Sequence, residues 1–311
     1  MMKRIASLLL MVFFATMVFA QDANDVNLIM ANAKKKASQQ DFTGAIKEYN
    51  RALRMKPGIA EAYCGRAEAK YYLGQYAEAM HDVNKAIEAN ANEAKFFTIR
   101  GMINAALKKT DDAIADFNKA IQVNSAYAEA YVQKSQVLFQ SSKEKEAFEL
   151  LNSKIEAMPN EAALYFGRGI LYSLKQKNEK ALEDLNKCSN LDAQYNVYNV
   201  TLAKGTVFMA LQEFHDAEAA FSEAISIAPN NALGYSSRGK LYYDQSKFDM
   251  AVEDYKKAIE CNPDNAALYF NMGMAYFKQN DKRNACERFH KACSMGNNNA
   301  CKMIILECSG K

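Results

Sequence analysis

Residues 94–127 read AKFFTIRGMINAALKKTDDAIADFNKAIQVNSAY, and their pattern recurs along most of the 311-residue chain. The clearest sign is an alanine that returns every 34 residues, with a single step of 36, at Ala45, Ala79, Ala113, Ala147, Ala181, Ala217, Ala251 and Ala285. Self-similarity at a period of this length indicates a solenoid built from repeated structural units.

Numbering the recurring alanine as position 20 divides the chain into eight repeats: 26–59, 60–93, 94–127, 128–161, 162–195, 198–231, 232–265 and 266–299. Position 8 is always alanine, glycine or serine, and position 24 is always a large apolar residue. We therefore expect two helices to approach closely at position 8. All four prolines fall on position 32, where a residue without an amide donor ends a helix.

This pattern resembles the tetratricopeptide repeat (TPR) family, with its small residue at position 8, alanines at 20 and 27, aromatics at 11 and 24, and proline at 32. The resemblance covers about 26–299. Departures are local: four repeats lack the proline, Lys154 replaces the alanine of position 27, and Asn196 and Val197 are inserted between repeats five and six.

Hydrophobic periodicity predicts the same architecture. Each repeat contains two amphipathic stretches separated by a polar break such as Leu73-Gly74-Gln75. One helix pair cannot bury its apolar face alone, so neighbouring pairs must supply the core. We predict an all-α fold, an α-solenoid forming a right-handed superhelix of about eight helix pairs with a concave and a convex face, followed by a capping helix and tail over 300–311.

Arginine at position 7 occurs in repeats two, three, five and seven, and only those repeats carry aspartate at position 23. The four pairs are Arg66 with Asp82, Arg100 with Asp116, Arg168 with Asp184, and Arg238 with Asp254. Their joint occurrence predicts a salt bridge between the two helices of each repeat, which suits the guanidinium fork. The alternative is an anion-binding ladder of arginines along the groove.

The N-terminus predicts export. Lys3 and Arg4 precede an apolar run, and small residues lie three and one before a cut after Ala20, so residues 1–20 resemble a secretory signal peptide, with 21–25 a short lead. An uncleaved anchor is the alternative. We expect a periplasmic, cell-surface or secreted protein, with no membrane span after the signal is removed. Without residues 1–20 the chain is almost neutral, so no nucleic-acid partner is expected.

Four of the seven cysteines lie in the last 26 residues. Cys286 and Cys293 are seven apart on one helix, and Cys301 and Cys308 are seven apart on the next. If these helices are antiparallel, disulfides Cys293–Cys301 and Cys286–Cys308 form two rungs. The segment around Cys293 and Cys301 also resembles Sel1-like repeats, in which cysteines at this separation form a disulfide. A zinc site would need all four sulfurs to converge.

No catalytic constellation is present. The three histidines fall in separate repeats, no glycine loop could cradle a phosphate, and Ser142 and Lys145 lie in a turn without a supporting motif. We expect no enzymatic activity, no cofactor and no metal. Among the remaining cysteines, Cys188 takes the place of a packing alanine. Cys64 is expected on the concave face and is the best candidate for an accessible thiol, although we expect this thiol to be passive.

The resemblance implies that first-helix positions 2, 5, 6, 9, 12 and 13 line the concave face. We predict that a partner is bound there by aromatic and amide side chains, with the alternative that some position-12 aromatics simply pack against the neighbouring helix. The predicted partner-binding residues are Tyr71, Tyr72, Gln133, Gln136, Phe139, Phe166, Tyr243, Phe270, Asn271 and Phe277.

The predicted function is therefore a non-enzymatic scaffold that binds a protein or peptide partner in its groove. The alternative is a self-associating structural or spacer protein of the cell envelope, possible as a homo-oligomer. No three successive repeats contain the residues that a carboxylate clamp requires. We therefore do not expect the partner to be an acidic peptide tail held by such a clamp.

Overall fold

The computed structural model describes residues 25–308, so the predicted signal peptide lies outside the described residues. All regular structure in this range is helical, and residues 25–38 form the first helical segment. The first helices of the later repeats are α3 (Ala60–Tyr72), α5 (Ala94–Ala106), α7 (Ala128–Gln140), α9 (Ala162–Leu174), α11 (Val197–Ala210), α13 (Ala232–Asp244) and α15 (Ala266–Lys278).

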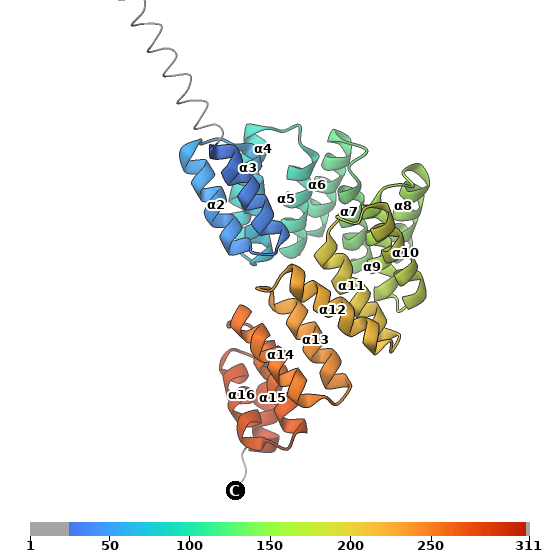
Figure 1. Cartoon of the computed structure of the whole chain (residues 1–311). Helices are drawn as coiled ribbons and strands as arrows, with labels where there is room; N and C mark the ends of the chain where they lie inside the picture. Colours follow the sequence, from blue (N-terminus) through green and yellow to red (C-terminus); the bar gives the residue numbers. More distant parts are fainter. Residues whose placement is uncertain (1–24, 309–311) are drawn as a thin grey trace, which may run out of the picture. The chain divides into compact units, whose positions relative to one another are not determined.

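The second helices are α2 (Phe42–Met55), α4 (Tyr76–Ala89), α6 (Thr110–Val123), α8 (Glu144–Ala157), α10 (Asn178–Leu191), α12 (Phe214–Ile227), α14 (Phe248–Cys261) and α16 (Lys282–Ser294). Each packs against the first helix of its own repeat and the first helix of the next repeat within its unit. Figure 1 shows this succession of helix pairs. The chain forms two compact units, up to Pro159 and from Asn160 onward. The predicted all-α solenoid fold is confirmed.

Positions 8 and 24 hold the two helices of a repeat together. A Cβ atom added to Gly101 would lie 2.6 Å from the ring of Phe117, and one added to Gly205 would lie 2.6 Å from the ring of Phe221. Phe117 and Phe221 are fully buried. Because the large side chain of position 24 occupies the space that a Cβ would need, the residue at position 8 of these repeats has to be glycine.

The turn between the two helices of every repeat contains a left-handed residue at position 15. Gly74 holds this position once, at φ +74°, and the other repeats use Gln40, Lys108, Ser142, Gln176, Gln212, Ser246 and Asn280 with φ between 56° and 63°. A residue in the left-handed conformation commonly ends a helix. The polar break in the middle of each repeat therefore adopts the same helix-ending turn every time.

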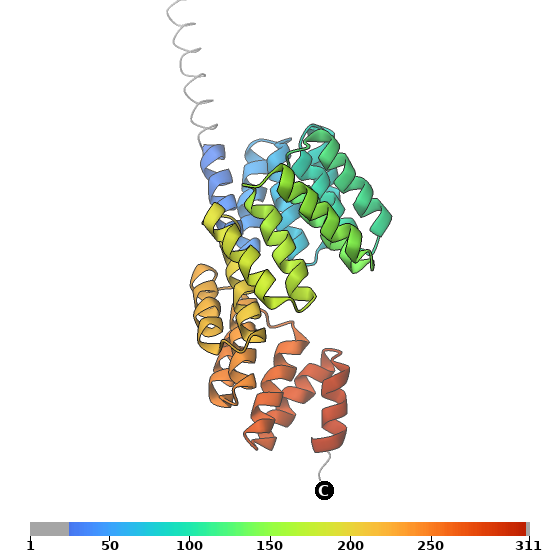
Figure 2. The same ribbon diagram turned by 90° about the vertical axis from the view of Figure 1, so that its right-hand side faces the viewer.

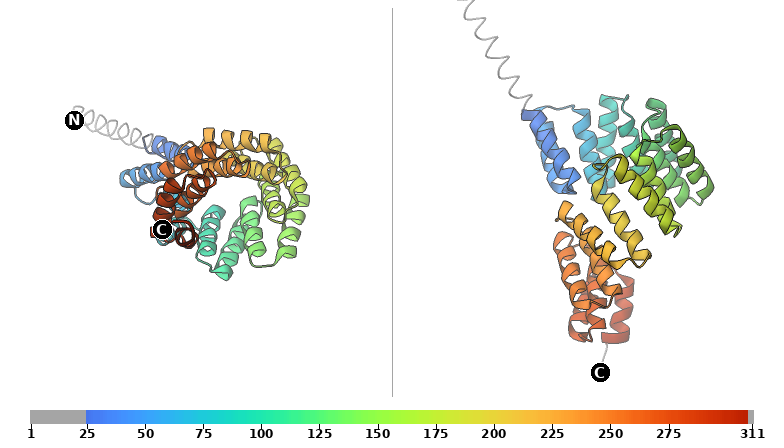
Figure 3. Two further views of the ribbon diagram at one scale, coloured as in Figure 1. Left: turned by 90° about the horizontal axis from the view of Figure 1, so that it is seen from below. Right: turned by 45° about the vertical axis from the view of Figure 1, so that its right-hand side comes forward.

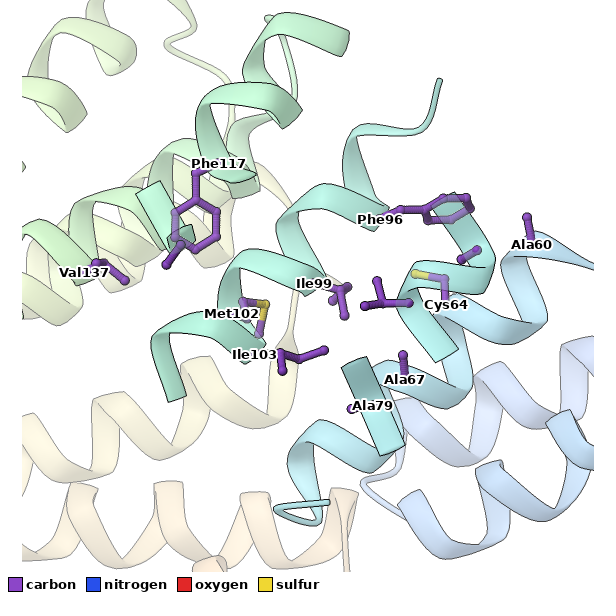
Figure 4. Packing of buried hydrophobic residues seen from close by; sticks show 13 residues of the cluster. Ala60, Cys64, Ala67, Ala79, Phe96, Ile99, Met102, Ile103, Phe117 and Val137 are labelled. Carbon is purple, nitrogen blue, oxygen red and sulfur yellow. The ribbon is translucent and has the colours of Figure 1, made fainter. Parts of the chain in front are cut away.

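One apolar cluster in the first unit spans repeats two to four. Phe96, Ile99 and Ile103 of α5 pack in one cluster with Cys64 and Ala67 of α3 (Figure 4). The cluster continues to Phe117 of α6 and Val137 of α7. The side chains of three consecutive repeats thus form one apolar core, as expected for helix pairs that cannot fold alone.

The four predicted arginine–aspartate salt bridges are confirmed. Arg100 donates from Nε to both carboxylate oxygens of Asp116 at 3.0 Å and from Nη2 at 2.6 Å. In the other three pairs Nε donates to one carboxylate oxygen and Nη2 to the other. All four aspartates are buried. Burial raises the pKa of Asp82, but hydrogen bonds from Arg66 and Lys70 outweigh it, so the pKa is lowered overall.

Arginines of these pairs also reach the preceding repeat. Arg66 donates to Asn50 at 2.6 Å, Arg100 to Asn84 at 3.4 Å, and Arg238 to Ser222 at 2.9 Å. Each acceptor occupies position 25 of the repeat before. The guanidinium therefore joins three helices, a contact that the sequence register alone did not indicate. Because its donors are used in these hydrogen bonds, its role is structural and the alternative of an anion-binding row of arginines is not supported.

The second unit ends in a cap held by cysteines. After α16 the chain forms α17 (Asn298–Met303) and a π-helical turn, η1 (Ile304–Cys308). The predicted capping helix over 300–311 therefore begins earlier and changes its winding, and its last three residues are not described. Cys293 and Cys301 lie at bonding distance, S–S 2.00 Å, as do Cys286 and Cys308 at 1.99 Å. Figure 2 shows the α15–α16 pair and the chain end beside it in red.

The two inserted residues lie at the start of the first helix of repeat six. Val197 is the first residue of α11, and Asn196 precedes it in a left-handed conformation at φ 44°. The helix pairs of the second unit follow one another on either side of this joint, from yellow-green to red in Figure 3. Within residues 25–308, no helix combines the length and the apolar character needed to cross a membrane.

Candidate partner-binding face

Helix contacts identify the inner face of each unit. In the first unit α3 contacts α5, and α5 contacts α7; in the second, α11 contacts α9 and α13, and α13 contacts α15. The second helices of successive repeats, such as α4 and α6, share no comparable contact within the described residues. First helices that approach one another while second helices diverge form the concave side of a curved stack. The predicted partner-binding residues all lie on first helices.

In the first unit, Tyr72 is the most exposed of the predicted residues, at 47%. Its ring stacks on Phe42 with centroids 4.6 Å apart, and Tyr71 lies edge-on to it at 5.3 Å. Aromatic pairs in these geometries attract one another beyond the area that they bury. Three aromatic side chains from α2 and α3 therefore form a partly open patch.

Helix α7 contributes Gln133, Gln136 and Phe139, all partly exposed. Gln133 donates from its amide nitrogen to Glu129 at 2.8 Å, whereas the amide of Gln136 has no hydrogen-bond partner in the described part of the chain. An amide in this state retains both its donors and its acceptor for a ligand. Gln136 is thus better placed than Gln133 to bind a peptide backbone.

The second unit brings three predicted residues together around one cavity. Tyr243, Phe270 and Asn271 line a recess of about 300 Å³ between α13 and α15. Tyr255 and Met274 complete its apolar wall, and Lys240 and Asp244, paired at 2.6 Å, lie at its polar side. The amide of Asn271 has no hydrogen-bond partner in residues 25–308. This combination of an apolar recess and a free amide is typical of a binding site.

The position-12 aromatics both pack and remain exposed. The ring of Tyr243 lies 5.6 Å from that of Phe248, and that of Phe139 lies 6.4 Å from that of Phe148. Phe277 packs on the C-terminal core cluster. Each of these three position-12 side chains nonetheless keeps part of its surface accessible. The second helix therefore holds the ring in place without covering it completely.

Phe166 is separated from the other predicted residues of the second unit. It is partly exposed, and its ring lies 6.0 Å from that of Tyr195. The side chain belongs to the core cluster of repeats five and six. It does not line the recess at Tyr243, so the structure divides the predicted set into separate groups.

The prediction that Cys64 is an accessible thiol is wrong. This thiol is only 2% exposed and lies in the core cluster with Phe96 and Ile99. Burial raises the pKa of Cys64 to about 12. It belongs to a first helix, as expected, but the side chains of the next repeat cover it. Cys188 is fully buried, in agreement with its packing position, and Cys261 is the free cysteine with partial exposure.

Several residues of the inner face were not predicted. Lys95 pairs with Glu68 at 2.7 Å, and interaction with Glu68 raises the pKa of Lys95 although burial lowers it. Phe42 supports Tyr72 from a second helix, where no inner-face position was considered. Lys240 and Asp244 do occupy inner positions 9 and 13 of repeat seven. The selection of aromatics and amides therefore left out charged residues that share the same surface.

Comparison with known proteins agrees with this architecture. Sequence models described as tetratricopeptide repeat match residues 30–95, 64–131, 162–195, 200–231 and 267–294, and one described as TPR repeat matches 239–280. Together they cover more than half of the chain. The protein therefore belongs to the tetratricopeptide repeat family. No curated protein gives a significant match.

Solved structures of other proteins share the fold. A chain of the APC/C hetero-tetramer Cut9-Hcn1 superposes with a TM-score of 0.65 at 14% identity, over 89% of this chain and 55% of that one. This protein thus spans about half the length of that chain. A tetratricopeptide repeat protein from Parabacteroides merdae ATCC 43184 gives a TM-score of 0.53 at 15% identity, covering 81% of this chain and 99% of that one. At these identities the similarity concerns the fold alone.

Proposed function

We propose that this protein is an exported, non-enzymatic scaffold that binds an extended segment of a protein partner on the inner faces of its helix pairs. The family consists largely of protein-interaction scaffolds. The observation that carries the proposal is the recess of about 300 Å³ where Tyr243, Phe270 and Asn271 meet.

The chemistry of the recess suits one apolar side chain of a peptide together with its backbone. Phe270 rests on buried Phe289, with ring centroids 5.9 Å apart, so its position is fixed before a partner arrives. An ordered ring loses little conformational entropy on binding, which favours affinity. The unpartnered amide of Asn271 can accept from a backbone N–H and donate to a carbonyl oxygen. The Tyr71–Tyr72 patch and Gln136 offer the same types of contact in the first unit.

The site of action that we propose is the periplasm or the cell surface. It rests on the signal-like residues 1–20 and on the paired C-terminal cysteines, since disulfides persist in oxidising compartments. Expression in a bacterium with an N-terminal sequence of the product tests this part. A mature chain that starts at Gln21 agrees with the proposal, and a full-length product retained in the inner membrane contradicts it.

Photo-crosslinking tests the binding face. A photoreactive phenylalanine analogue replaces Tyr243 in the exported protein, and the matched control carries it at His215, an exposed residue at the start of α12. We expect one dominant adduct from Tyr243, none from His215, and loss of that adduct in a Phe270→Ala variant. Equal adducts at both positions would exclude the inner face. Adducts only between copies of the chain would favour a self-associating structural role instead.

A further inference from the structure

A second cavity lies at the joint between repeats five and six, away from the inner-face recess. It has a volume of about 460 Å³, within the range of small-molecule sites. Its walls come from α10, the connecting segment, α11 and α12. The residues that decide its chemistry are Asn186, Asp192, Lys204, Asp216, Ala220 and Glu223.

The cavity exists because repeat six lacks a structural triad found elsewhere. In repeats two and three, arginine at position 7 bridges aspartate at position 23 and asparagine at position 25 of the preceding repeat. At this joint the asparagine is kept as Asn186, but Lys204 replaces the arginine and Ala220 replaces the aspartate. Two shorter side chains leave the volume open.

The same substitutions leave polar groups without their usual partners. Lys204 donates to Ser189 at 2.9 Å and makes no ion pair among the described residues. Burial lowers the pKa of Lys204. Asn186 has no side-chain hydrogen bond within residues 25–308. The carboxylate of Glu223 attracts this partly buried ammonium but forms no ion pair with it in residues 25–308, so an anionic group that enters the cavity can approach the ammonium directly and would be stabilised there.

Charges of both signs line the cavity, and the carboxylate of Glu223 attracts the ammonium of Lys204. Asp192, Asp216 and Glu223 contribute carboxylates, and none of them forms an ion pair with Lys204. The rings of Tyr195 and Phe208 add apolar surface between the polar groups. A ligand with a single charge would satisfy one side only. A molecule with an ammonium and a carboxylate satisfies both.

We propose that this cavity binds a small zwitterion of the amino-acid class, as a free amino acid or a dipeptide. Its carboxylate pairs with Lys204 and accepts from the amide of Asn186. Its ammonium faces the carboxylates of Glu223, Asp192 and Asp216. This site is separate from the partner-binding recess, because the two cavities share no lining residue.

Isothermal titration calorimetry on the full mature chain tests the proposal. The probes are the free amino acids and glycine-containing dipeptides, each compared with its C-terminal amide and its N-acetyl derivative, and putrescine is the purely cationic probe. We expect heat from at least one zwitterion at millimolar concentration and none from its two derivatives. No zwitterion binding, or binding of putrescine alone, would overturn the assignment.

Two variants locate the site. Lys204→Met removes the ammonium and is expected to weaken binding on the order of tenfold or more. The double variant Lys204→Arg with Ala220→Asp restores the triad with Asn186 and closes the cavity, so it should abolish binding while thermal stability is kept or raised. Lys240→Met in the other recess is the matched control and should bind normally. Undiminished binding in the closed variant would place the site elsewhere.

Discussion

The clearest quantitative test of the fold is the buried pair of Arg100 and Asp116. Besides the three arginine hydrogen bonds, Asp116 accepts from the buried amide of Asn104 at 2.9 Å. The side chain of Asp116 is 8% exposed and that of Arg100 is 29% exposed. Replacing Asp116 with alanine leaves both donors without their acceptor.

Removing one partner of a buried ion pair costs about 3–5 kcal/mol. Because Arg100 keeps part of its hydration, we expect the lower end for Asp116→Ala, about 3 kcal/mol. In a double-mutant cycle with Arg100→Ala, the interaction energy should be about 2 kcal/mol, within the range for residues in one network. The double variant should therefore be less destabilised than the two single losses added together.

Urea unfolding followed by circular dichroism measures the free energies, and hydrogen exchange of α5 and α6 shows whether the loss is local. Because stability in repeat arrays is carried by neighbouring units, exchange should increase most in repeats two to four. The matched control is the exposed pair of Lys257 and Glu260, whose disruption should cause no measurable change. An interaction energy below about 0.5 kcal/mol for Arg100 and Asp116 would refute the argument.

Three further predictions concern acid stability, thiol reactivity and the turns. The lowered pKa of Asp82 contributes stability that is complete above its ordinary pKa of 3.8 and is lost as the pH falls through the lowered pKa. In an acid titration, the free energy of unfolding of Asp82→Asn should therefore depend less on pH than that of the parent between neutral and strongly acidic pH. In native protein with its disulfides intact, iodoacetamide should modify Cys261 first and leave Cys64 unmodified until unfolding; equal rates by mass spectrometry would contradict the burial of Cys64. Lys108→Gly removes a left-handed non-glycine residue and should stabilise the fold by about 0.5–1 kcal/mol, and a lower melting temperature would argue against strain at φ 61°.

Much of the fold could be read from the sequence because each repeat restates it. Gly101 and Phe117 recur as a small and a large residue at fixed spacing, and their contact is what holds the helix pair together. The arginine–aspartate pairs were predictable for a similar reason, since both members appear or disappear together. Local spacing on two adjacent helices was enough to predict these contacts.

Contacts between repeats were harder to predict. Cys64 occupies an inner-face position, yet Phe96 and Ile99 of the following repeat cover it, and a position number says nothing about the size of the neighbours. The cavity at the repeat-six joint was also missed. The sequence does show that Lys204 and Ala220 replace the arginine and aspartate of the other repeats. A missing salt bridge does not by itself indicate a cavity, so the cavity became evident only in the structure.

The cysteine-bonded cap makes the two ends of the chain unequal. The two disulfides close loops with sequence separations of 8 and 22 residues. In the chain-entropy description, the lost entropy of the unfolded chain corresponds to stabilisation by about 2.5 and 3.4 kcal/mol, respectively. The helical segment 25–38 has no such link, since the nearest cysteine in sequence, Cys64, is free. An unfoldase that pulls on this protein would therefore unfold the repeats in order from the amino end. The carboxyl end would be the last part to lose its structure.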